Sequence, residues 1–109
     1  MNLLNETKEK MKECGYQPSD ILFIGSRESG HSCTWDEFVR MADREYDDGF
    51  GRHEVAIDLE IIFNDGGVMM RREYDGSEWW ECISPFKPIP KKPIKTLFVK
   101  YECTLADVN

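Results

Sequence analysis

Residues 54–83 read EVAIDLEIIFNDGGVMMRREYDGSEWWECI, and this stretch decides the fold. Apolar and other side chains alternate from residue 55 to residue 63, which is typical of a half-buried strand. The signals Asp65-Gly66 and Asp75-Gly76 each separate two strand-like segments. Because such dipeptides favour tight hairpin turns, the stretch predicts a meander of three antiparallel strands. One face of the first strand would hold Val55, Ile57, Leu59, Ile61 and Phe63.

The lengths of the two turns determine which residues face each other. A two-residue loop at Asp65-Gly66 is expected, and it pairs Phe63 with Val68 and Ile61 with Met70. This register places Met70 on the same face as the apolar residues of the first strand.

A three-residue loop at residues 74–76 is expected at the second turn. A two-residue loop would set Glu73 opposite Glu78, and like charges directly opposite each other are destabilising. The longer loop places Arg71 opposite Trp79 instead, and Met70 opposite Trp80.

The adjacent residues Trp79 and Trp80 must point to opposite faces of a strand. Trp80 is expected in the core with the apolar face. Trp79 is expected on a second face of mixed composition, together with Glu60, Ile62, Met69, Arg71, Glu73 and Glu81. Two interpretations of this second face remain open. In the first, the face has no binding role: Arg71 stacks on Trp79, and the face is exposed to solvent or covered by the last strand. In the second, it is a binding face, because Trp, Arg and Met are enriched at interfaces.

Further elements flank the meander on both sides. Helical spacing predicts a helix over residues 2–14, and an apolar run predicts a buried strand over residues 21–24. Thr34 and Glu37 form a capping box, so a second helix should begin there and run to about residue 46. Residues 85–93 contain four prolines and predict an extended connection. A final strand is expected from the alternation of Leu97, Val99, Tyr101 and Cys103.

These elements predict a single α+β domain over residues 1–109. Two helices would pack on one face of a mainly antiparallel sheet with a central three-strand meander. The length of 109 residues suits one core, and 40% hydrophobic with 32% charged residues is a globular composition. No apolar run approaches the roughly 20 residues of a membrane helix. The start of the chain lacks a signal peptide, so a cytoplasmic protein without membrane contact is expected.

The four cysteines, Cys14, Cys33, Cys82 and Cys103, include no Cys-x-x-Cys pair. In a cytoplasmic chain they are expected to be reduced. Structural zinc sites show closely spaced ligand pairs, which are missing here, so neither a metal nor a cofactor is predicted.

The net charge of −7 is unevenly distributed along the chain. Residues 1–84 contain 19 acidic and 9 basic residues, a net charge of −10, whereas residues 85–109 have a net charge of +3. The acidic body argues against direct binding of nucleic acid, which normally requires a basic patch. It is compatible with a partner protein that has a basic surface, and equally with a role in solubility alone.

Catalytic motifs are weak in this sequence. His31 lies near Cys33 and several serines, but proximity in sequence does not make a catalytic pair or triad. The loop over residues 25–30 lacks the spacing and the lysine of a phosphate loop. The protein is therefore expected not to be an enzyme. An alternative is a site for an anionic, nucleotide-like ligand, formed by Arg27, Trp35, Tyr46, Arg71 and Trp79.

Four stretches resemble a group of small acidic uncharacterised phage and prophage proteins of Firmicutes. They are SRESGHSCTWDEF (26–38), ADREYDDGFG (42–51), EVAIDLEIIFNDGG (54–67) and RREYDGSEWWE (71–81). The resemblance covers about residues 20–85, and the motif YDGSEWWE is its most specific part. The group usually carries a further aromatic pair where this chain has Met69 and Met70.

The resemblance implies a phage accessory protein that acts in the cytoplasm of a bacterial host. Such proteins often block host defence, in the manner of anti-CRISPR proteins, so a non-enzymatic counter-defence inhibitor is expected. It would dock through an acidic face on a basic host defence protein, using Trp79, Glu78, Glu81, Asp36, Asp43, Asp47 and Asp48. The alternatives are a sponge that sequesters a nucleotide immune signal, or a structural or assembly accessory of the phage. Exposed strand edges also allow a homodimer.

Overall fold

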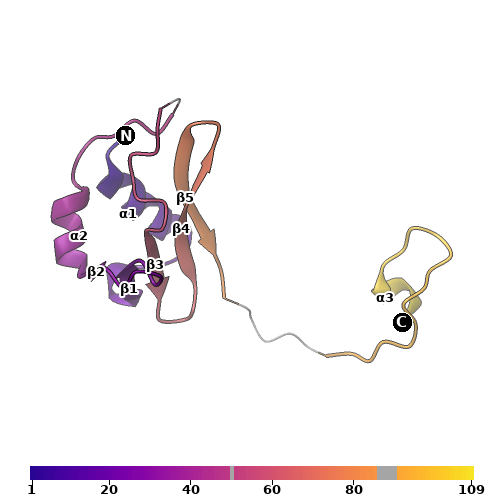
Figure 1. Ribbon diagram of the computed structural model, residues 1–109. Coiled ribbons are helices and arrows are strands. Elements are labelled where there is room, and N and C mark those ends of the chain that lie inside the picture. Colours follow the sequence, from indigo (N-terminus) through magenta and orange to yellow (C-terminus); the bar gives the residue numbers. More distant parts are fainter. Residues whose placement is uncertain (50, 86–90) are drawn as a thin grey trace.

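The computed structural model describes residues 1–49, 51–85 and 91–109 (Figure 1). Five antiparallel strands form one open sheet in the order β2-β1-β3-β4-β5, accompanied by helices, which confirms the α+β class and the central meander. The elements are α1 (Leu3–Glu13), a 3₁₀ helix (Pro18–Asp20), β1 (Ile21–Gly25), β2 (Ser32–Cys33), α2 (Trp35–Ala42), β3 (Glu60–Phe63), β4 (Val68–Tyr74), β5 (Ser77–Ile83) and α3 (Leu105–Val108).

Helix α1 forms where the helical spacing predicts it. The side chain of Asn2 accepts a hydrogen bond from the amide of Asn5 and caps the first turn. Thr7 and Met11 are buried on one side of the helix, and Gly15 follows its end with a φ of +85°.

Helix α2 begins with the expected capping box between Thr34 and Glu37. It ends at Ala42, four residues earlier than predicted. The next residues pair with the start of the chain instead: the amide of Leu3 donates to the carbonyl of Arg44 at 3.2 Å. These long-range hydrogen bonds replace the helical ones that the local sequence favours.

Strand β3 is also shorter than predicted, because it begins at Glu60 rather than near residue 55. The amides of Glu54 and Val55 donate to the carboxylate of Glu78, at 2.9 and 3.3 Å. This contact holds residues 54–55 outside the sheet, and a turn in which the amide of Leu59 bonds to the carbonyl of Ala56 then leads into β3.

Both turns of the meander differ from the prediction by one residue. The first loop has three residues, 64–66, and the amide of Phe63 donates to the carbonyl of Gly67 at 2.9 Å. The carboxylate of Asp65 accepts from the amide of Gly67 at 2.8 Å and from the hydroxyl of Tyr16, which stabilises this longer loop. Ile61 therefore pairs with Met69 rather than with Met70.

The second loop has two residues instead of three. Asp75 and Gly76 both have positive φ, +52° and +83°, as a type I′ turn requires. Glu73 lies opposite Glu78, the arrangement that charge repulsion was expected to exclude. The repulsion is relieved because Arg71, on the same face, forms an ion pair with Glu78 at 3.0 Å.

The first loop is one residue longer than predicted, and the second loop is one residue shorter. The two differences therefore exchange the predicted faces of β4 and leave the predicted faces of β5 unchanged. Trp80 is 2% exposed and Trp79 is 40% exposed, as predicted. In β4, however, Met69 and Arg71 are buried, whereas Met70 and Arg72 lie on the other face. The predicted pairing of Arg71 with Trp79 is therefore wrong; Arg72 pairs with Trp79.

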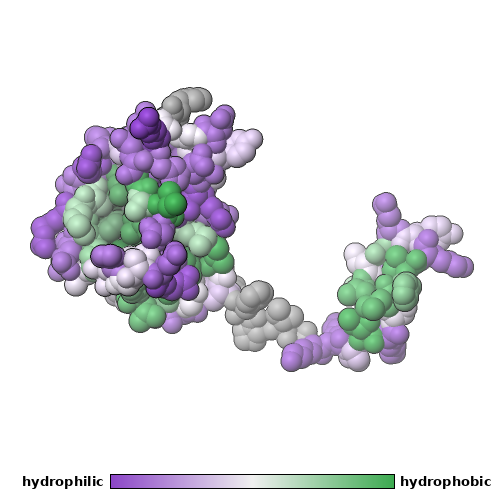
Figure 2. Space-filling view, in the orientation of Figure 1, coloured by the Kyte–Doolittle hydropathy of each residue, from purple (hydrophilic) through white to green (hydrophobic). Residues whose placement is uncertain are grey.

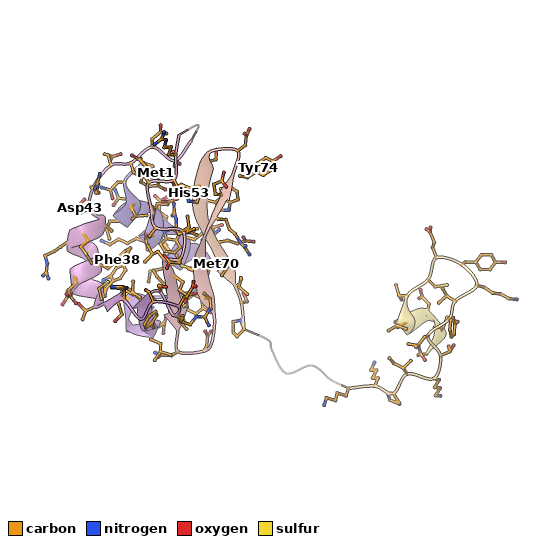
Figure 3. The ribbon with its side chains drawn as sticks, viewed as in Figure 1. Met1, Phe38, Asp43, His53, Met70 and Tyr74 are labelled. Atoms are coloured by element: carbon orange, nitrogen blue, oxygen red, sulfur yellow. A yellow bond between two sulfur atoms is a disulfide. The ribbon has the colours of Figure 1, made fainter. Side chains whose placement is uncertain are left out.

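The core lies between the sheet and the two longer helices, α1 and α2. The indole nitrogen of Trp80 donates to the hydroxyl of Thr7 on α1 at 2.8 Å, so its polar group is satisfied. Figure 3 shows Phe38 of α2 between the helix and the sheet. The buried apolar residues are Leu4, Met11, Ile24, Phe38, Ala42, Ile61, Phe63, Met69 and Trp80.

A disulfide joins Cys14, directly after α1, to Cys82 in β5. The expectation that all four cysteines are reduced is therefore wrong for this pair. The two residues are 68 positions apart in sequence, and packing of α1 on β5 brings them together. Cys33 and Cys103 are free thiols.

Residues 91–109 contain no strand, so the predicted strand from Leu97 to Cys103 is wrong; α3 is their one regular element. The side chain of Asn109 accepts from the amides of Lys95 and Thr96, which closes the segment on itself. Figure 1 shows it apart from the sheet. The radius of gyration of 19.0 Å exceeds the roughly 13 Å of a compact chain of this length. The expected extended connection lies mostly at residues 86–90, outside the described residues.

Candidate functional site

A buried ionic cluster joins β4 and β5, near their turn, to α1 and to the loop after α2. The guanidinium of Arg71 donates to Glu78 and to the hydroxyl of Tyr46 at 3.0 Å each, and to Glu6 at 3.3 Å. The Arg71 side chain is 1% exposed. It also lies over the ring of Trp80, 5.0 Å from the centroid.

The electrostatics of this cluster keep Arg71 and Glu78 charged as an ion pair. Burial acts to raise the pKa of Glu78, but the amides of Glu54 and Val55 and the charge of Arg71 outweigh it and lower that pKa. Burial also acts to lower the pKa of Arg71, whereas Tyr46, Glu6 and Glu78 raise it. Burial and then the hydrogen bond to Glu6 raise the pKa of Tyr46. These pKa shifts keep Glu78 ionised, Arg71 charged and Tyr46 neutral near neutral pH.

Three predicted site residues belong to this cluster and are buried: Tyr46, Arg71 and Glu78. The structure places all three inside the protein rather than on an exposed surface, and their part in binding a partner or a ligand stays a prediction. Their contacts join β4, β5, α1 and the loop after α2, although the buried Nε of Arg71 has no hydrogen-bond partner among the described residues.

The face of the sheet opposite the helices carries a mixed apolar and charged surface, which we call the outer face. Trp79 is a large exposed aromatic residue of this face, on the edge strand β5 near the β4–β5 turn, and it lies opposite Arg72. Arg72 forms an ion pair with Glu81 at 2.5 Å, with both side chains about half exposed. The outer face consists of Ile62, Val68, Met70, Arg72, Trp79, Glu81 and Ile83.

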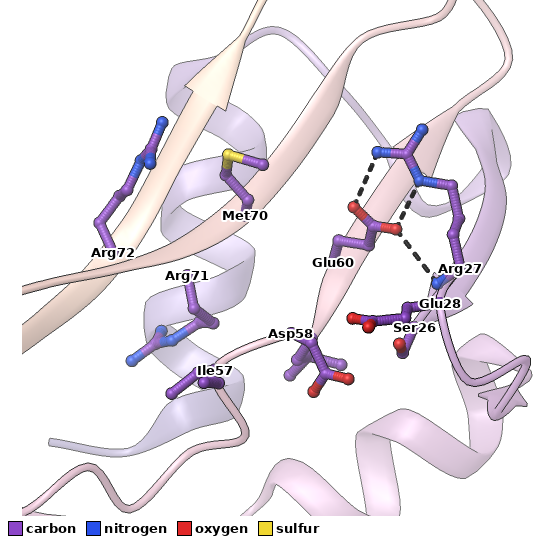
Figure 4. A pocket seen from close by; sticks show the side chains of 10 residues that line it. Ser26, Arg27, Glu28, Ile57, Asp58, Glu60, Met70, Arg71 and Arg72 are labelled. Carbon is purple, nitrogen blue, oxygen red and sulfur yellow. Dashed lines mark hydrogen bonds and ion pairs between the residues drawn. The ribbon is translucent and has the colours of Figure 1, made fainter.

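A pocket of about 400 Å³ adjoins the outer face where β3 begins while β4 continues (Figure 4). Met70, Arg71 and Arg72 line it from β4, Glu60 lines it from the start of β3, and residues 26–28 and 57–59 line it from two loops. Arg27 forms two hydrogen bonds to Glu60, at 2.6 and 3.0 Å, and lowers the pKa of this carboxyl group. The exposed cations at this pocket, Arg27 and Arg72, are therefore neutralised by carboxylates.

The five residues predicted to bind an anionic ligand do not form one site. Arg27 and Arg71 line the same pocket, but Arg71 is bound within the ionic cluster. Trp35 stacks on Phe38, with 5.6 Å between the ring centroids, and Trp79 lies on the outer face. Binding an anionic nucleotide would require breaking existing ion pairs.

The residues predicted to dock on a protein divide between two surfaces. Asp36 and Asp43 are exposed on or directly after α2, on the helical side of the sheet (Asp43 is labelled in Figure 3). Trp79 and Glu81 are exposed on the outer face. In the loop after α2, Asp47 is exposed and Asp48 is half-buried, and the Asp48 carbonyl accepts from the amide of Glu78 at 2.9 Å.

Arg72 and Met70 were missed as members of the outer face. The alternation along β4 separates Met70 and Arg72 from Met69 and Arg71. Only the correct turn length shows which of these two pairs faces the core. Glu6 was also missed, because nothing local in α1 indicates an ion pair with a residue 65 positions away.

The candidate nucleophile Cys33 has no activating environment. Burial, followed by the charge of Glu37, raises the pKa of its thiol, which lowers the fraction of reactive thiolate. Within residues 1–49, 51–85 and 91–109, no group of three or more His, Cys, Asp or Glu side chains could hold a metal ion.

Neither a protein-family model, nor a curated protein, nor a solved structure matches the chain. In the described part of the chain, no helix is both long and apolar enough to span a membrane.

Proposed function

We propose that this protein is a non-enzymatic binding protein that docks on another protein through the outer face. The observation that carries the proposal is the exposure of Trp79 beside the Arg72–Glu81 ion pair, on a sheet face that neither α1 nor α2 covers. Tryptophan and arginine dominate the binding energy of many interfaces. Half-buried Met70 and exposed Ile83 supply apolar area on the same face, on the side of Trp79 that lies away from the β4–β5 turn.

The charge of the body indicates the chemistry of the partner. Residues 1–84 have a net charge of −10, so a partner with a basic surface would be attracted over the distance of about one Debye length. In the phage context that the sequence resemblance implies, we propose a host defence protein as the partner and inhibition as the outcome.

The outer face serves this role better than the acidic residues of α2. Asp36 and Asp43 offer charge without an adjacent aromatic anchor on the same face, whereas the outer face combines charge with Trp79. The proposed contact residues are therefore Trp79, Glu81, Arg72 and Met70, and the helical acids contribute to long-range attraction.

A capture experiment tests the proposal with two matched variants. Immobilised protein is incubated with extract of the bacterial host at low salt, and each captured protein is purified and titrated by calorimetry. Trp79→Ala should weaken binding at least tenfold, as expected for an aromatic residue that supplies much of the binding energy. Met41→Ala should bind normally, because Met41 is a large exposed apolar residue on α2, on the other side of the sheet.

The outcomes separate the proposed function from its alternatives. Equal binding by wild type and Trp79→Ala contradicts docking through the outer face, and capture of no protein at low salt contradicts protein docking altogether. Affinity for a basic partner should fall steeply as salt rises above the physiological range. Capture of a phage particle component would instead support an assembly role. A rise in Tm with cyclic or adenine nucleotides would favour sequestration of a nucleotide signal.

A further inference from the structure

Strand β4 continues past the point where β3 begins, which leaves a gap in the sheet. The pairing of the two strands ends at Glu60 with Met70, whereas β4 runs on to Tyr74. Residues 56–59, which we call the strap, turn away here instead of continuing β3 along β4. The pocket of about 400 Å³ lies at this gap, between the strap and β4 (Figure 4).

The backbone of β4 is only partly paired at the gap. Alternate residues of an antiparallel strand direct their backbone groups to the same side. The carbonyl of Gly67 accepts from the amide of Phe63, so Arg71 and Glu73 point to the side of β3 as well. In the described part of the chain, the carbonyl of Arg71 and both backbone groups of Glu73 have no backbone partner. The gap therefore offers hydrogen-bonding groups for a continued strand.

The strap has the sequence pattern of a strand, although it forms a turn. Its side chains belong to the alternation that runs from residue 55 to residue 63. In the structure, the amide of Leu59 donates to the carbonyl of Ala56 at 3.2 Å and closes the turn. Ile57 is 71% exposed. Figure 2 shows apolar side chains at the surface of the sheet-containing part, between hydrophilic ones. The local pattern thus favours a second conformation.

The register of β3 on β4 determines where each residue of a straightened strap would lie. One pair beyond Glu60, Leu59 would lie opposite Arg71. Its amide would then donate to the carbonyl of Arg71 instead of closing the turn. Two residues further on, Ile57 would lie opposite Glu73 and exchange both backbone hydrogen bonds with it. Straightening therefore supplies the partners that β4 lacks.

The same register brings opposite charges together on the outer face. Asp58 would lie directly opposite Arg72, and opposite charges at such positions stabilise a sheet. In the turn, both residues line the pocket, and Arg72 forms its ion pair with Glu81. Figure 4 shows Asp58 and Arg72 at different sides of the pocket. A straight strap would therefore close the pocket and give Arg72 a second carboxylate.

Two sets of hydrogen bonds oppose this movement. One is the bond between Leu59 and Ala56 within the turn, and the other joins the amides of Glu54 and Val55 to the carboxylate of Glu78. Straightening would lengthen the distance between the α-carbons of residues 56 and 59 from less than about 7 Å to about 10 Å. The bonds to Glu78 must yield or shift to allow this, so Glu78 restrains the strap.

We propose that the strap is a lid that alternates between the turn seen here and a straight form, in which it extends β3 as far as a pair between Ile57 and Glu73 and closes the pocket. The occupant of the gap is thus the chain that directly precedes β3. This inference goes beyond the proposed function, because it concerns the backbone of the sheet and holds whatever the outer face binds.

Disulfide trapping detects the straight form directly. In that form positions 58 and 72 are a non-hydrogen-bonded pair, with about 4.5 Å between their α-carbons, which suits a disulfide. The variant Asp58→Cys/Arg72→Cys is made with Cys33→Ala and Cys103→Ala, so that the introduced thiols have no other free partner. Oxidised glutathione takes up the two electrons and both thiol protons, and leaves as two reduced molecules. Peptide mass spectrometry should then find a link between positions 58 and 72.

Proline at position 57 locks the lid open. Proline suits the second position of a type I turn, and the amide of Ile57 donates to no described residue in the turn form. Ile57→Pro removes only the bond to Glu73 that the straight form requires, so the link should form at least about tenfold more slowly. The matched control Ile57→Thr retains the amide and strand propensity, and the link should form at the original rate.

Hydrogen exchange provides a second measurement without introduced cysteines. The amide of Glu73 should exchange more slowly in the wild type and in Ile57→Thr than in Ile57→Pro, because only a straight strap accepts its hydrogen bond. Ile57 is exposed, so both single variants should keep the Tm of the wild type. A link that does not form, or that forms equally fast with Ile57→Pro, overturns the proposal. Equal exchange of the Glu73 amide in the wild type and Ile57→Pro overturns it as well.

Discussion

Replacement of Arg71 by methionine is the sharpest test of the register of β4. Arg71 donates to Glu78 and Tyr46 at 3.0 Å and to Glu6 at 3.3 Å, and its side chain is 1% exposed. Arg71→Met retains much of the side-chain volume but leaves two carboxylates near the core without their cation. Loss of one partner of a buried ion pair destabilises a protein by about 3–5 kcal/mol. We therefore expect a loss of this size in the free energy of unfolding.

Arg72→Met provides the matched control at the neighbouring position. Arg72 also forms an ion pair, but its side chain and that of Glu81 are about half exposed. Exposed pairs contribute about 0–1 kcal/mol, so Arg72→Met should unfold close to the wild type. Urea titrations followed by tryptophan fluorescence measure both variants, because Trp80 leaves the core on unfolding.

A third variant tests the coupling between the two charges. Glu78→Gln should destabilise the Arg71→Met protein less than the wild type, because Glu78 no longer has a cation to lose. If Arg71→Met and Arg72→Met lose equal stability, the buried ionic cluster contributes no more to the free energy of unfolding than the exposed Arg72–Glu81 pair. If Arg72→Met loses more, the faces of β4 are the reverse of those described and the turn reasoning fails.

Three further predictions concern the core, the disulfide and pH. Trp80→Ala should lower the free energy of unfolding by about 3–5 kcal/mol, whereas Trp79→Ala should change it by less than about 1 kcal/mol; reversed values in urea titrations would contradict the assigned faces. Reduction of the Cys14–Cys82 disulfide, which closes a loop of 68 residues, should lower stability by about 4 kcal/mol, and equal midpoints with and without reductant would refute this. The pKa of Glu78 in the folded protein is lowered from 4.5. Its contribution to the free energy of unfolding is therefore complete above pH 4.5 and disappears as the pH falls through the folded pKa. Glu78→Gln should therefore reduce the acid dependence of stability, and an unchanged dependence would contradict this.

Local patterns in the sequence determined most of the secondary structure. Helical spacing and the Thr34–Glu37 capping box predicted α1 and the start of α2, and alternation predicted the meander. These signals are reliable here because they depend on residues within a few positions of each other. The opposite orientations of Trp79 and Trp80 follow from the same local rule, since neighbouring side chains of any strand point to opposite faces.

The faces of β4 depended on a choice that local sequence left undecided. Both turns contain Asp-Gly, which suits loops of two or three residues. The first loop is the longer one because Asp65 also bonds to Tyr16, 49 positions away. The second is the shorter one because Arg71 neutralises Glu78. Each choice rests on a contact that exists after folding, so sequence reasoning placed Arg71 on the wrong face.

Tertiary structure alone decided the contacts between distant residues. The bond between Cys14 and Cys82, and the cluster of Arg71 with Glu6 and Glu78, require helix and sheet to be packed first. The strand predicted over residues 97–103 does not form, because the tertiary contact that it requires is missing. Alternating side chains favour a sheet, but a strand forms only where a neighbouring strand pairs with its backbone groups. In the described part of the chain, no strand pairs with residues 97–103.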